Sequence, residues 1–275
     1  MLSCPVCQSP LTQGEKEAFC EKGHRFDRAK EGYFNLLMSS SAKGHGDDRA
    51  MLRARRTFLE KGYYAHLLSA LKEEILPLLK DGDVLVDAGC GEGYYTKGLV
   101  DQGKKEGKEL SLYAFDISKE AVRLTSRKLE GEGNFFVAST YKIPMAEGSA
   151  DVVCSFFAPY SEEEFLRLIR PGGYLVRAVP LRDHLFSLKQ AVYENPKKNE
   201  GEAVIGEGFT LIGERRVRKE ITLETTEDIL ALFDMTPYAH KTGREDMAKL
   251  EKLTSLTVET DFGILLYQRE KKSLK

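Results

Sequence analysis

Apolar runs of strand length alternate with amphipathic segments of helical length through the middle of the chain. Unbroken apolar runs are typical of parallel strands that are buried on both faces, and the amphipathic segments predict the helices that connect such strands. The alternation predicts an α/β fold, with a mostly parallel sheet and helices on both faces. The strands are expected at 84–86, 110–115, 134–138, 151–157 and 174–179, with helices starting near 94, 118 and 162.

The pattern is less regular on either side of this core. A capped helix over 48–60 and a longer amphipathic helix over 65–79 are expected before the first strand. The polar stretch 39–48 has no apolar period and predicts a linker. The C-terminal part predicts helices at 183–193, 227–233 and 244–253, a polar loop at 195–208, a strand at 215–223 and an antiparallel pair of strands within 255–268. We therefore divide the chain into residues 1–38, a linker and basic helix at 39–64, and a large domain at 65–275.

A glycine-rich loop follows the first strand of the large domain. Asp87 ends the strand, and Gly89, Gly91 and Gly93 follow in the pattern G-x-G-x-G. Glycines at such a turn let the backbone approach a ligand closely. A helix that starts near Tyr94 would direct its N-terminal amides toward that ligand.

The acid that closes the next strand narrows the choice of ligand. Asp116 lies 23 residues after Gly93, near the spacing of about 20 residues at which an acid contacts ribose in nucleotide-binding βαβ units. The loop lacks the dinucleotide pattern G-x-G-x-x-G, and no P-loop lysine follows it. Strand carboxyl ends meet at one edge of a parallel sheet, so a single cleft is expected there. The residues expected at this edge are Asp87, Asp116, Ser139, Thr140, Ala158, Pro159 and the segment after Val179.

The first residues of the chain have the spacing of a metal site. Cys4, Cys7, Cys20 and His24 form the pattern C-x2-C-x12-C-x3-H, which is typical of zinc. Four protein ligands leave no open position for water, so a structural ion is expected. A segment of about 35 residues is too small to bury a core of its own, and a metal would stabilise it.

Basic side chains between the metal pattern and the first strand allow two interpretations. Residues 23–37 mix basic and aromatic residues, which suits single-stranded RNA or an interface between domains. In the expected helix after the linker, Arg49, Arg53 and Arg56 share one stripe, which is either a solvated face or a surface that binds phosphate or holds the N-terminal domain against the larger one. Arg55 projects toward the apolar side, where it requires a carboxylate or phosphate partner.

Composition and charge limit the classes of partner. The 275 residues carry a net charge of −2, so any nucleic acid must bind to a local basic surface. The sequence has no run of 18 apolar residues, and its start, MLSCPVC, does not have the pattern of a signal peptide. A cytoplasmic protein with reduced cysteines is expected, without a membrane partner.

Taken together, these motifs resemble the bacterial guanine-N1-methyltransferases of 23S rRNA. The resemblance covers nearly the whole chain and rests on the Cys3His pattern, HRFDRAKEGYFNLL, RAMLRARRTFLEKGYY, DAGCGEGYYT and YAP, in that order. It implies a class I, Rossmann-like methyltransferase domain that uses S-adenosylmethionine, behind a small zinc-binding domain that recognises RNA. It also implies methylation of N1 of a guanine in a hairpin loop of domain II. One branch of the family contributes to macrolide-type antibiotic resistance, and the sequence does not identify the guanine.

The resemblance also assigns residues. The family's zinc ligands fall on Cys4, Cys7, Cys20 and His24, and its cofactor contacts on Tyr64, Gly91, Glu92 and His184. Without the resemblance, a lone histidine such as His184 is more often structural. The full candidate cofactor set is Tyr64, Asp87, Gly89, Gly91, Glu92, Gly93, Asp116, Ser139, Thr140 and His184. Residues 158–160 are expected to line the pocket for the target base, and no catalytic base is assigned.

Two other functions compete with rRNA methylation at this point. A small-molecule methyltransferase of the same fold would leave the N-terminal domain without a role. A non-catalytic RNA-binding module would leave the glycine-rich loop unexplained. The expected partner is the 23S rRNA hairpin, and a homodimer is a possibility that the sequence does not test.

Overall fold

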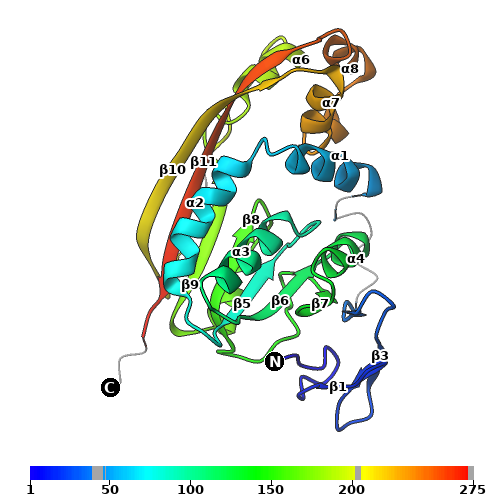
Figure 1. The fold of residues 1–275 in the computed structure, drawn as a ribbon, viewed down its shortest axis with the longest axis vertical. Helices are drawn as coiled ribbons and strands as arrows, with labels where there is room; N and C mark the ends of the chain where they lie inside the picture. The colour runs from blue at the N-terminus through cyan, green and yellow to red at the C-terminus, as the bar shows by residue number, and fades with distance from the viewer. Residues whose placement is uncertain (39–45, 47, 202–205, 272–275) are drawn as a thin grey trace.

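An eight-stranded sheet forms the centre of the protein in the computed structural model, which describes residues 1–38, 46, 48–201 and 206–271 (Figure 1). The strands are hydrogen-bonded in the order β10-β11-β9-β8-β5-β6-β7-β4. β11 is antiparallel to both of its neighbours, whereas the pairings from β9 to β4 are parallel. The strands are β4 (Tyr33–Asn35), β5 (Val84–Ala88), β6 (Ser111–Asp116), β7 (Asn134–Val137), β8 (Ala150–Phe156), β9 (Ile169–Pro180), β10 (Phe209–Leu223) and β11 (Leu256–Arg269).

Helices and the N-terminal segment cover the two faces of this sheet. One apolar cluster packs strand residues such as Leu85 and Val152 against α2, α3 and α4. A second cluster packs Val86 and Val153, from the opposite side of the same strands, against α5 and the N-terminal segment. The helices are α1 (Arg49–Glu60), α2 (Ala65–Ile75), α3 (Tyr94–Lys105), α4 (Lys119–Lys128), α5 (Glu162–Leu168), α6 (Phe186–Val192), α7 (Thr226–Asp234) and α8 (Arg244–Leu250), with short 3-10 turns η2 (Leu76–Leu78) and η3 (Ala239–Lys241).

The strand order fixes where a ligand can bind. β5 lies between β6 and β8, so the connections from the central strands run in opposite directions. Ligands of doubly wound sheets bind outside the carboxyl ends of the strands at such a switch point. The fold therefore presents the ends of β5, β6, β7, β8 and β9 to one binding region, as the sequence pattern predicted.

The C-terminal part corrects two predictions. Residues 255–268 do not form an antiparallel pair, because β11 is one continuous strand that pairs with β10 on one side and β9 on the other. β10 starts at Phe209, before the predicted start at residue 215. Figure 1 shows these two strands as a long ribbon that reaches beyond the rest of the sheet toward α6, α7 and α8.

The N-terminal segment is joined to the large sheet. Its own sheet consists of β1 (Thr12–Gln13), β2 (Glu17–Phe19) and β3 (Arg25–Asp27). β4 then leaves it and pairs in parallel with β7. Tyr33 and Phe34 are buried in this pairing, which selects the domain-interface interpretation of their aromatic rings over RNA stacking.

The helices before the first strand match their predicted positions closely. Asp48 caps α1 by accepting hydrogen bonds from the amides of Ala50 and Met51. α2 is shorter than predicted, because Pro77 lies in a 3-10 turn after Ile75. Most of the predicted linker, 39–45 and 47, lies outside the described residues. No helix in the described part of the chain is long and apolar enough to cross a membrane.

Candidate functional site

A cavity of about 1740 Å³ opens at the carboxyl ends of β5 to β9. Its walls include the glycine-rich loop, the inner face of α1, the segment after α7 and residues 3–5 of the N-terminal segment. It is larger than the roughly 300–1,000 Å³ of most small-molecule sites. Nine of the ten candidate cofactor residues line it: Tyr64, Asp87, Gly89, Gly91, Glu92, Asp116, Ser139, Thr140 and His184.

The tenth candidate, Gly93, supports the loop instead of lining the cavity. It precedes α3 with φ at +84°, and a Cβ there would lie 3.0 Å from Thr125 of α4. Gly89 has φ at +88°, and a Cβ there would lie 2.5 Å from Ala158 at the end of β8. These two glycines are required because the loop is pressed between α4 and the β8 end.

Asp116 braces the loop from the end of β6. Its Oδ2 accepts a hydrogen bond from the Gly91 amide at 3.1 Å, and its Oδ1 accepts one from the Ser118 amide at 2.8 Å. The carboxylate is therefore held at the cavity wall between the glycine-rich loop and the start of α4. This is the position from which an acid contacts ribose hydroxyls in related folds.

Asp87 is more deeply buried, with 2% of its surface exposed. Thr96 donates a hydrogen bond to its Oδ2 at 2.5 Å. Burial, reinforced by the charge of Asp116, raises the pKa of Asp87 to about 7 against the effect of that hydrogen bond. Asp87 therefore carries only part of its charge near neutral pH.

His184 also lines the cavity, and a backbone contact holds its ring in one tautomer. It is 8% exposed, and burial lowers its pKa to about 3. The backbone amide of Asp261 donates to Nδ1 at 3.2 Å, so the proton of the neutral ring is on Nε2. The Asp261 side chain accepts two hydrogen bonds from Arg216, at 2.7 and 2.8 Å, which fixes this part of β11. The ring thus offers a donor and no accessible acceptor.

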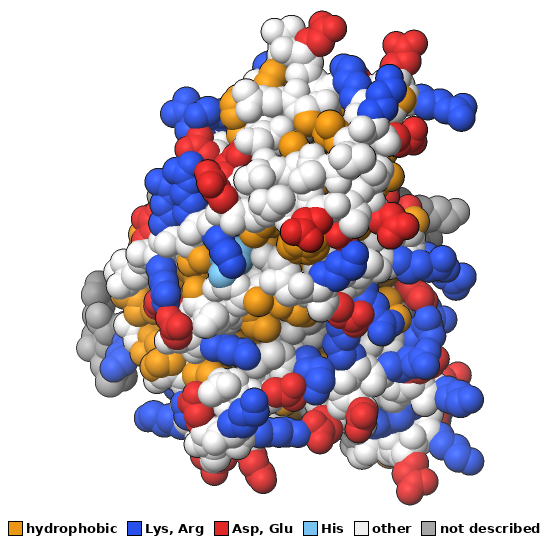
Figure 2. Space-filling view, turned by 45° about the horizontal axis from the view of Figure 1, so that its top comes forward, with side chains coloured by type: hydrophobic (Ala, Val, Ile, Leu, Met, Phe, Trp, Pro, Cys, Tyr) orange, Lys and Arg blue, Asp and Glu red, His pale blue; other side chains and the backbone are white. Residues whose placement is uncertain are grey.

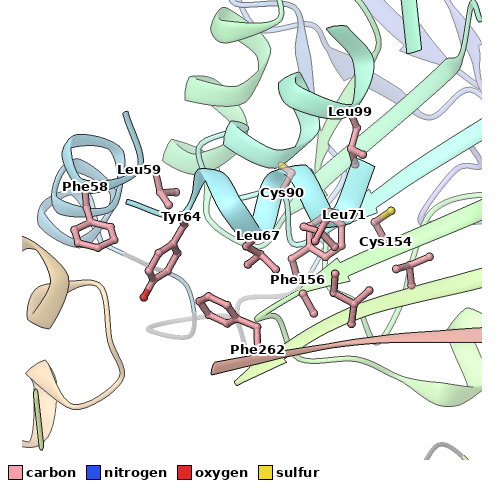
Figure 3. Close-up of a cluster of buried hydrophobic side chains, with 14 of the residues drawn as sticks. Phe58, Leu59, Tyr64, Leu67, Leu71, Cys90, Leu99, Cys154, Phe156 and Phe262 are labelled. Carbon is pink, nitrogen blue, oxygen red and sulfur yellow. The ribbon is translucent and has the colours of Figure 1, made fainter. Parts of the chain in front are cut away.

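Aromatic packing positions Tyr64 beside this histidine. Its ring lies edge-on to Phe262 at 5.0 Å and to Phe58 at 5.0 Å between ring centroids. Figure 3 shows the tyrosine from the turn before α2 packed between Phe58 of α1 and Phe262 of β11. The residue is 3% exposed, and its hydroxyl has no hydrogen-bond partner among the described residues.

A cationic side chain lies near two such hydroxyls. The Tyr95 hydroxyl is likewise buried without a hydrogen-bond partner in the described part of the chain. Burial raises the pKa of both Tyr64 and Tyr95, and the positive charge of Arg55 opposes the rise in each. Arg55 lines the cavity, and its Nη1 lies 3.6 Å from where a Cβ on Gly91 would be. Two orphaned donors and a guanidinium in one corner fit an anionic group such as a carboxylate.

Glu92 reaches a structural partner through one of its two carboxylate oxygens. It is almost fully buried, and its carboxylate is paired with Lys128 of α4. The pair joins the glycine-rich loop to α4. The other oxygen, Oε1, is buried without a hydrogen-bond partner among the described residues, so Glu92 can still accept a hydrogen bond from a ligand.

The wall formed by the end of β8 carries aromatic side chains. Phe157 has a positive φ of +55° and remains 43% exposed, which is unusual for a large apolar residue. Arg177 of β9 is buried and lies over the ring of Tyr160, 3.9 Å from its centroid. All three side chains line the cavity, next to Ala158 and Pro159. They form a flat, partly apolar surface that suits a planar base.

The four predicted metal ligands converge at the N-terminus. All four donor atoms lie within 4.8 Å of one another. The Sγ atoms of Cys7 and Cys20 are 3.7 Å apart, and His24 Nδ1 is 3.5 Å from Cys4 Sγ and 3.3 Å from Cys20 Sγ. Tetrahedral zinc with three sulfurs and one nitrogen requires edges of about 3.5–3.8 Å. The donor set and its spacing therefore fit a closed zinc site.

Sequence reasoning missed several residues of the cavity wall. Tyr95 follows the glycine-rich loop and Phe157 precedes residues 158–160, but their place in the cavity wall depends on tertiary packing. Arg55 was singled out because its charge is on the apolar side of a helix, and the cavity accounts for that placement. The segment from Met235 to Tyr238 gave no signal, because nothing local shows that the turn after α7 closes over the sheet.

Comparison with known proteins gives consistent matches over these regions. Residues 2–41 match a zinc-ribbon family model described as "RlmA, N-terminal", and residues 86–177 match one described as "Methyltransferase domain". The chain is 31% identical to the 23S rRNA (guanine(748)-N(1))-methyltransferase of Streptomyces fradiae, over 81% of this chain and 80% of that protein. It is 29% identical to YxjB of Bacillus subtilis, which is provisionally named a 23S rRNA (guanine-N(1)-)-methyltransferase, over 97% and 96% of the two chains. The solved structure of B. subtilis YcgJ aligns over 76% of this chain and all of that one, with 13% identity and a TM-score of 0.48.

The fold and the glycine-rich site define the protein as an enzyme with a class I methyltransferase domain, which confirms the predicted fold class. More specifically, the chain belongs to the family of 23S rRNA (guanine-N1)-methyltransferases.

Proposed function

We propose that this enzyme transfers the methyl group of S-adenosylmethionine to N1 of a guanine in the domain II hairpin of 23S rRNA. The observation that carries the proposal is the single cavity that joins the glycine-rich loop to the N-terminal segment. A site for a small cofactor alone needs neither this volume nor a wall from a second segment. An rRNA substrate also supports a cytoplasmic location.

The residues around the glycine-rich loop would hold the cofactor, which supplies an activated methyl group when bound. Asp116 would accept hydrogen bonds from ribose hydroxyls, and Ser139 and Thr140 would contact the adenine. Arg55 and the Tyr64 hydroxyl would hold the carboxylate end, since they form the cationic corner beside Gly91. Asp116 and the ring of Tyr64 are already fixed by protein contacts, which limits the freedom that they lose on binding.

The aromatic wall at the end of β8 would hold the guanine. N1 of guanine is shielded in a stacked or paired base, so the base must leave its stack to reach the cavity. Phe157 presents an exposed ring there, and Arg177 stacked on Tyr160 would extend the surface. His184 would not accept the proton that leaves N1, because its only accessible ring nitrogen already carries a hydrogen.

The N-terminal segment would bind a structural zinc ion through Cys4, Cys7, Cys20 and His24. Hydrogen bonding by Ser9 lowers the pKa of Cys7 to about 6, and the thiolate is the form that binds metal. The ion would hold residues 3–8 against the cavity, where they border the expected path of the RNA.

Methyl transfer from labelled S-adenosylmethionine tests the proposal. The purified protein is offered protein-free 23S rRNA in one reaction and a small-molecule extract in another. Label is expected in the RNA and absent from the extract. Label found only in small molecules would reject the proposal in favour of a small-molecule methyltransferase. No transfer to either substrate would reject both proposed reactions.

A further inference from the structure

A second hollow lies where the N-terminal segment, α1 and α4 meet. Its volume is about 610 Å³, and it is on a different face of α1 from Arg55. Figure 2 shows Lys and Arg side chains gathered along the right-hand side of the molecule, on which α1 and α4 lie in Figure 1. The residues that line the hollow are Tyr33, Arg49, Arg53, Lys119, Glu120 and Arg123.

Among the described residues that line the hollow, the one carboxylate is already engaged. Both oxygens of Glu120 accept hydrogen bonds from Arg123, at 3.0 and 2.7 Å. Arg123 also lies 3.7 Å from Glu31. Arg49 reaches Glu120 only at 4.0 Å and is 78% exposed. The Arg123–Glu120 pair is therefore a structural contact between neighbouring turns of α4. Among the described residues, Arg49 and Arg53 feel the charge of Glu120 only from a greater distance than Arg123 does.

Arg53 and Lys119 differ from Arg123 in this respect. Neither has a carboxylate within 4.0 Å among the residues for which side chains are described, and both are exposed. Arg56, on the same stripe of α1, is paired with Glu60 at 2.8 Å and does not line the hollow. The structure thus separates two arginines that helical periodicity places together.

We propose that this hollow binds a backbone phosphate of the RNA substrate, through Arg53 and Lys119 with support from Arg49. Arginine matches phosphate geometry with two parallel donors, and lysine adds a point charge. The buried ring of Tyr33 closes the bottom of the hollow, so the cations surround one site instead of a flat surface. The inference rests on the proposed function, because it requires that RNA be the ligand.

The position of the hollow links it to the methyl-transfer site. Lys119 is the first residue of α4, three residues after Asp116. α1 lies between the hollow and the cavity, with Arg53 on one side and Arg55 on the other, and a helix is about 10–12 Å across with its side chains. A phosphate held in the hollow would therefore place the adjoining nucleotides near the cavity mouth.

The salt dependence of RNA binding tests this site. Affinity of the full-length protein for a fluorescent domain II hairpin is measured by anisotropy over a series of KCl concentrations. Each phosphate contact contributes about 0.7–0.9 to the slope of log K against log salt. Replacing Arg53→Gln and Lys119→Gln together should reduce the slope by roughly 0.7–0.9, which is the contribution of the one phosphate that the hollow holds.

Matched variants keep the test specific. Arg56→Gln, on the same helix but paired with Glu60, and Lys97→Gln, paired with Asp101 on α3, should each leave the slope nearly unchanged. Affinity for S-adenosylmethionine and the melting temperature should also stay the same in all variants. An unchanged slope in the double variant, or an equal loss in Arg56→Gln, would overturn the hollow as a phosphate site.

The outcome is independent of the catalytic proposal. Methyl transfer to 23S rRNA with an unchanged slope would reject the hollow and keep the proposed function. A reduced slope in a protein that transfers no methyl group to rRNA would keep the hollow and reject the proposed function. A wild-type protein that does not bind the hairpin would overturn both.

Discussion

The N-terminal segment and the methyltransferase domain border the same cavity, but different interactions stabilise the fold of each. In the methyltransferase domain, two apolar clusters cover the two faces of the sheet. The strands of the small N-terminal sheet are two or three residues long, and the centre of the segment is the Cys/His cluster. Burial therefore stabilises the methyltransferase domain. The N-terminal segment adds Leu2, Ala18, Phe34 and Leu36 to the second cluster and would depend on metal ligation as well. The two sides should respond separately to substitution.

Loss of one metal ligand should have the largest effect on this difference. Cys7→Ser removes a corner of the tetrahedron, and structural zinc contributes on the order of 10 kcal/mol to folding of such units. Amide hydrogen exchange should become fast over residues 1–28, while β4 keeps its protection through pairing with β7. RNA methylation should fall severely, with affinity for S-adenosylmethionine changed by less than about threefold.

A buried cysteine elsewhere provides the control for this variant. Cys154→Ala in β8 should lower global stability by about 1 kcal/mol, the scale of a small core truncation, and leave exchange in the N-terminal segment unchanged. Metal analysis of the wild-type protein should find close to one zinc per chain. Protein without zinc that keeps a protected N-terminal segment would contradict the account.

Asp116→Ala should weaken the other side of the cavity. The substitution removes the expected ribose contact and the two hydrogen bonds that brace Gly91 and Ser118. A loss of roughly 1.5–3 kcal/mol in binding of S-adenosylmethionine is expected, about 10- to 150-fold. Titration calorimetry measures it, with Asp101→Ala on the exposed face of α3 as a control that should bind normally. Unchanged affinity in Asp116→Ala would show that this carboxylate does not contact S-adenosylmethionine.

The pH dependence of stability should show the smallest effect, and it reports on His184. The pKa of this histidine is about 3 in the folded protein and about 6.5 in an unfolded chain. The unfolded state therefore takes up a proton first as pH falls, so the stability that neutral His184 contributes is full above pH 6.5 and declines below it. The decline amounts to about 2 kcal/mol at pH 5.

Comparison of variants isolates this contribution. His184→Gln should lose about 2 kcal/mol less than wild type between pH 7 and pH 5, measured by urea unfolding at each pH. Asp87, whose raised pKa acts in the opposite direction over part of this range, is present in both proteins and cancels. His66→Gln, at a less buried histidine, should change the profile less. Identical profiles for His184→Gln and wild type would show that folding does not lower the pKa of His184.

The parts of the structure that sequence predicted are those in which local pattern and burial coincide. β5, β6 and β8 contain mostly apolar runs, and Asp87, Asp116 and Phe156 at or next to their ends line the cavity, so the parallel sheet and the cleft followed from general rules. The spacing of the three cysteines and the histidine similarly predicted that their donor atoms would lie together. Placement of the candidate residues around one cavity required only that the carboxyl ends of parallel strands share an edge.

The parts that sequence did not predict depend on contacts between distant segments. β4 is three residues long, and its pairing with β7 cannot be read from its own pattern. β11 is one strand where sequence predicts an antiparallel pair, although Asp261 and Gly263 lie in the middle of its apolar run. In the structure Asp261 is paired with Arg216 on β10, and Gly263 faces Leu181, which keep the strand continuous. The same dependence separates Arg53 from Arg56, which share a helical stripe but not an environment.

Mapping of the modified nucleotide tests the central claim most directly. Protein-free 23S rRNA is incubated with the enzyme and S-adenosylmethionine, then digested for nucleoside mass spectrometry and copied by reverse transcriptase. The account predicts 1-methylguanosine as the product, with a single new stop in the domain II hairpin, because a methyl group on N1 blocks base pairing. A methyl group on another guanine atom, a stop in another domain, or RNA without modification would contradict it.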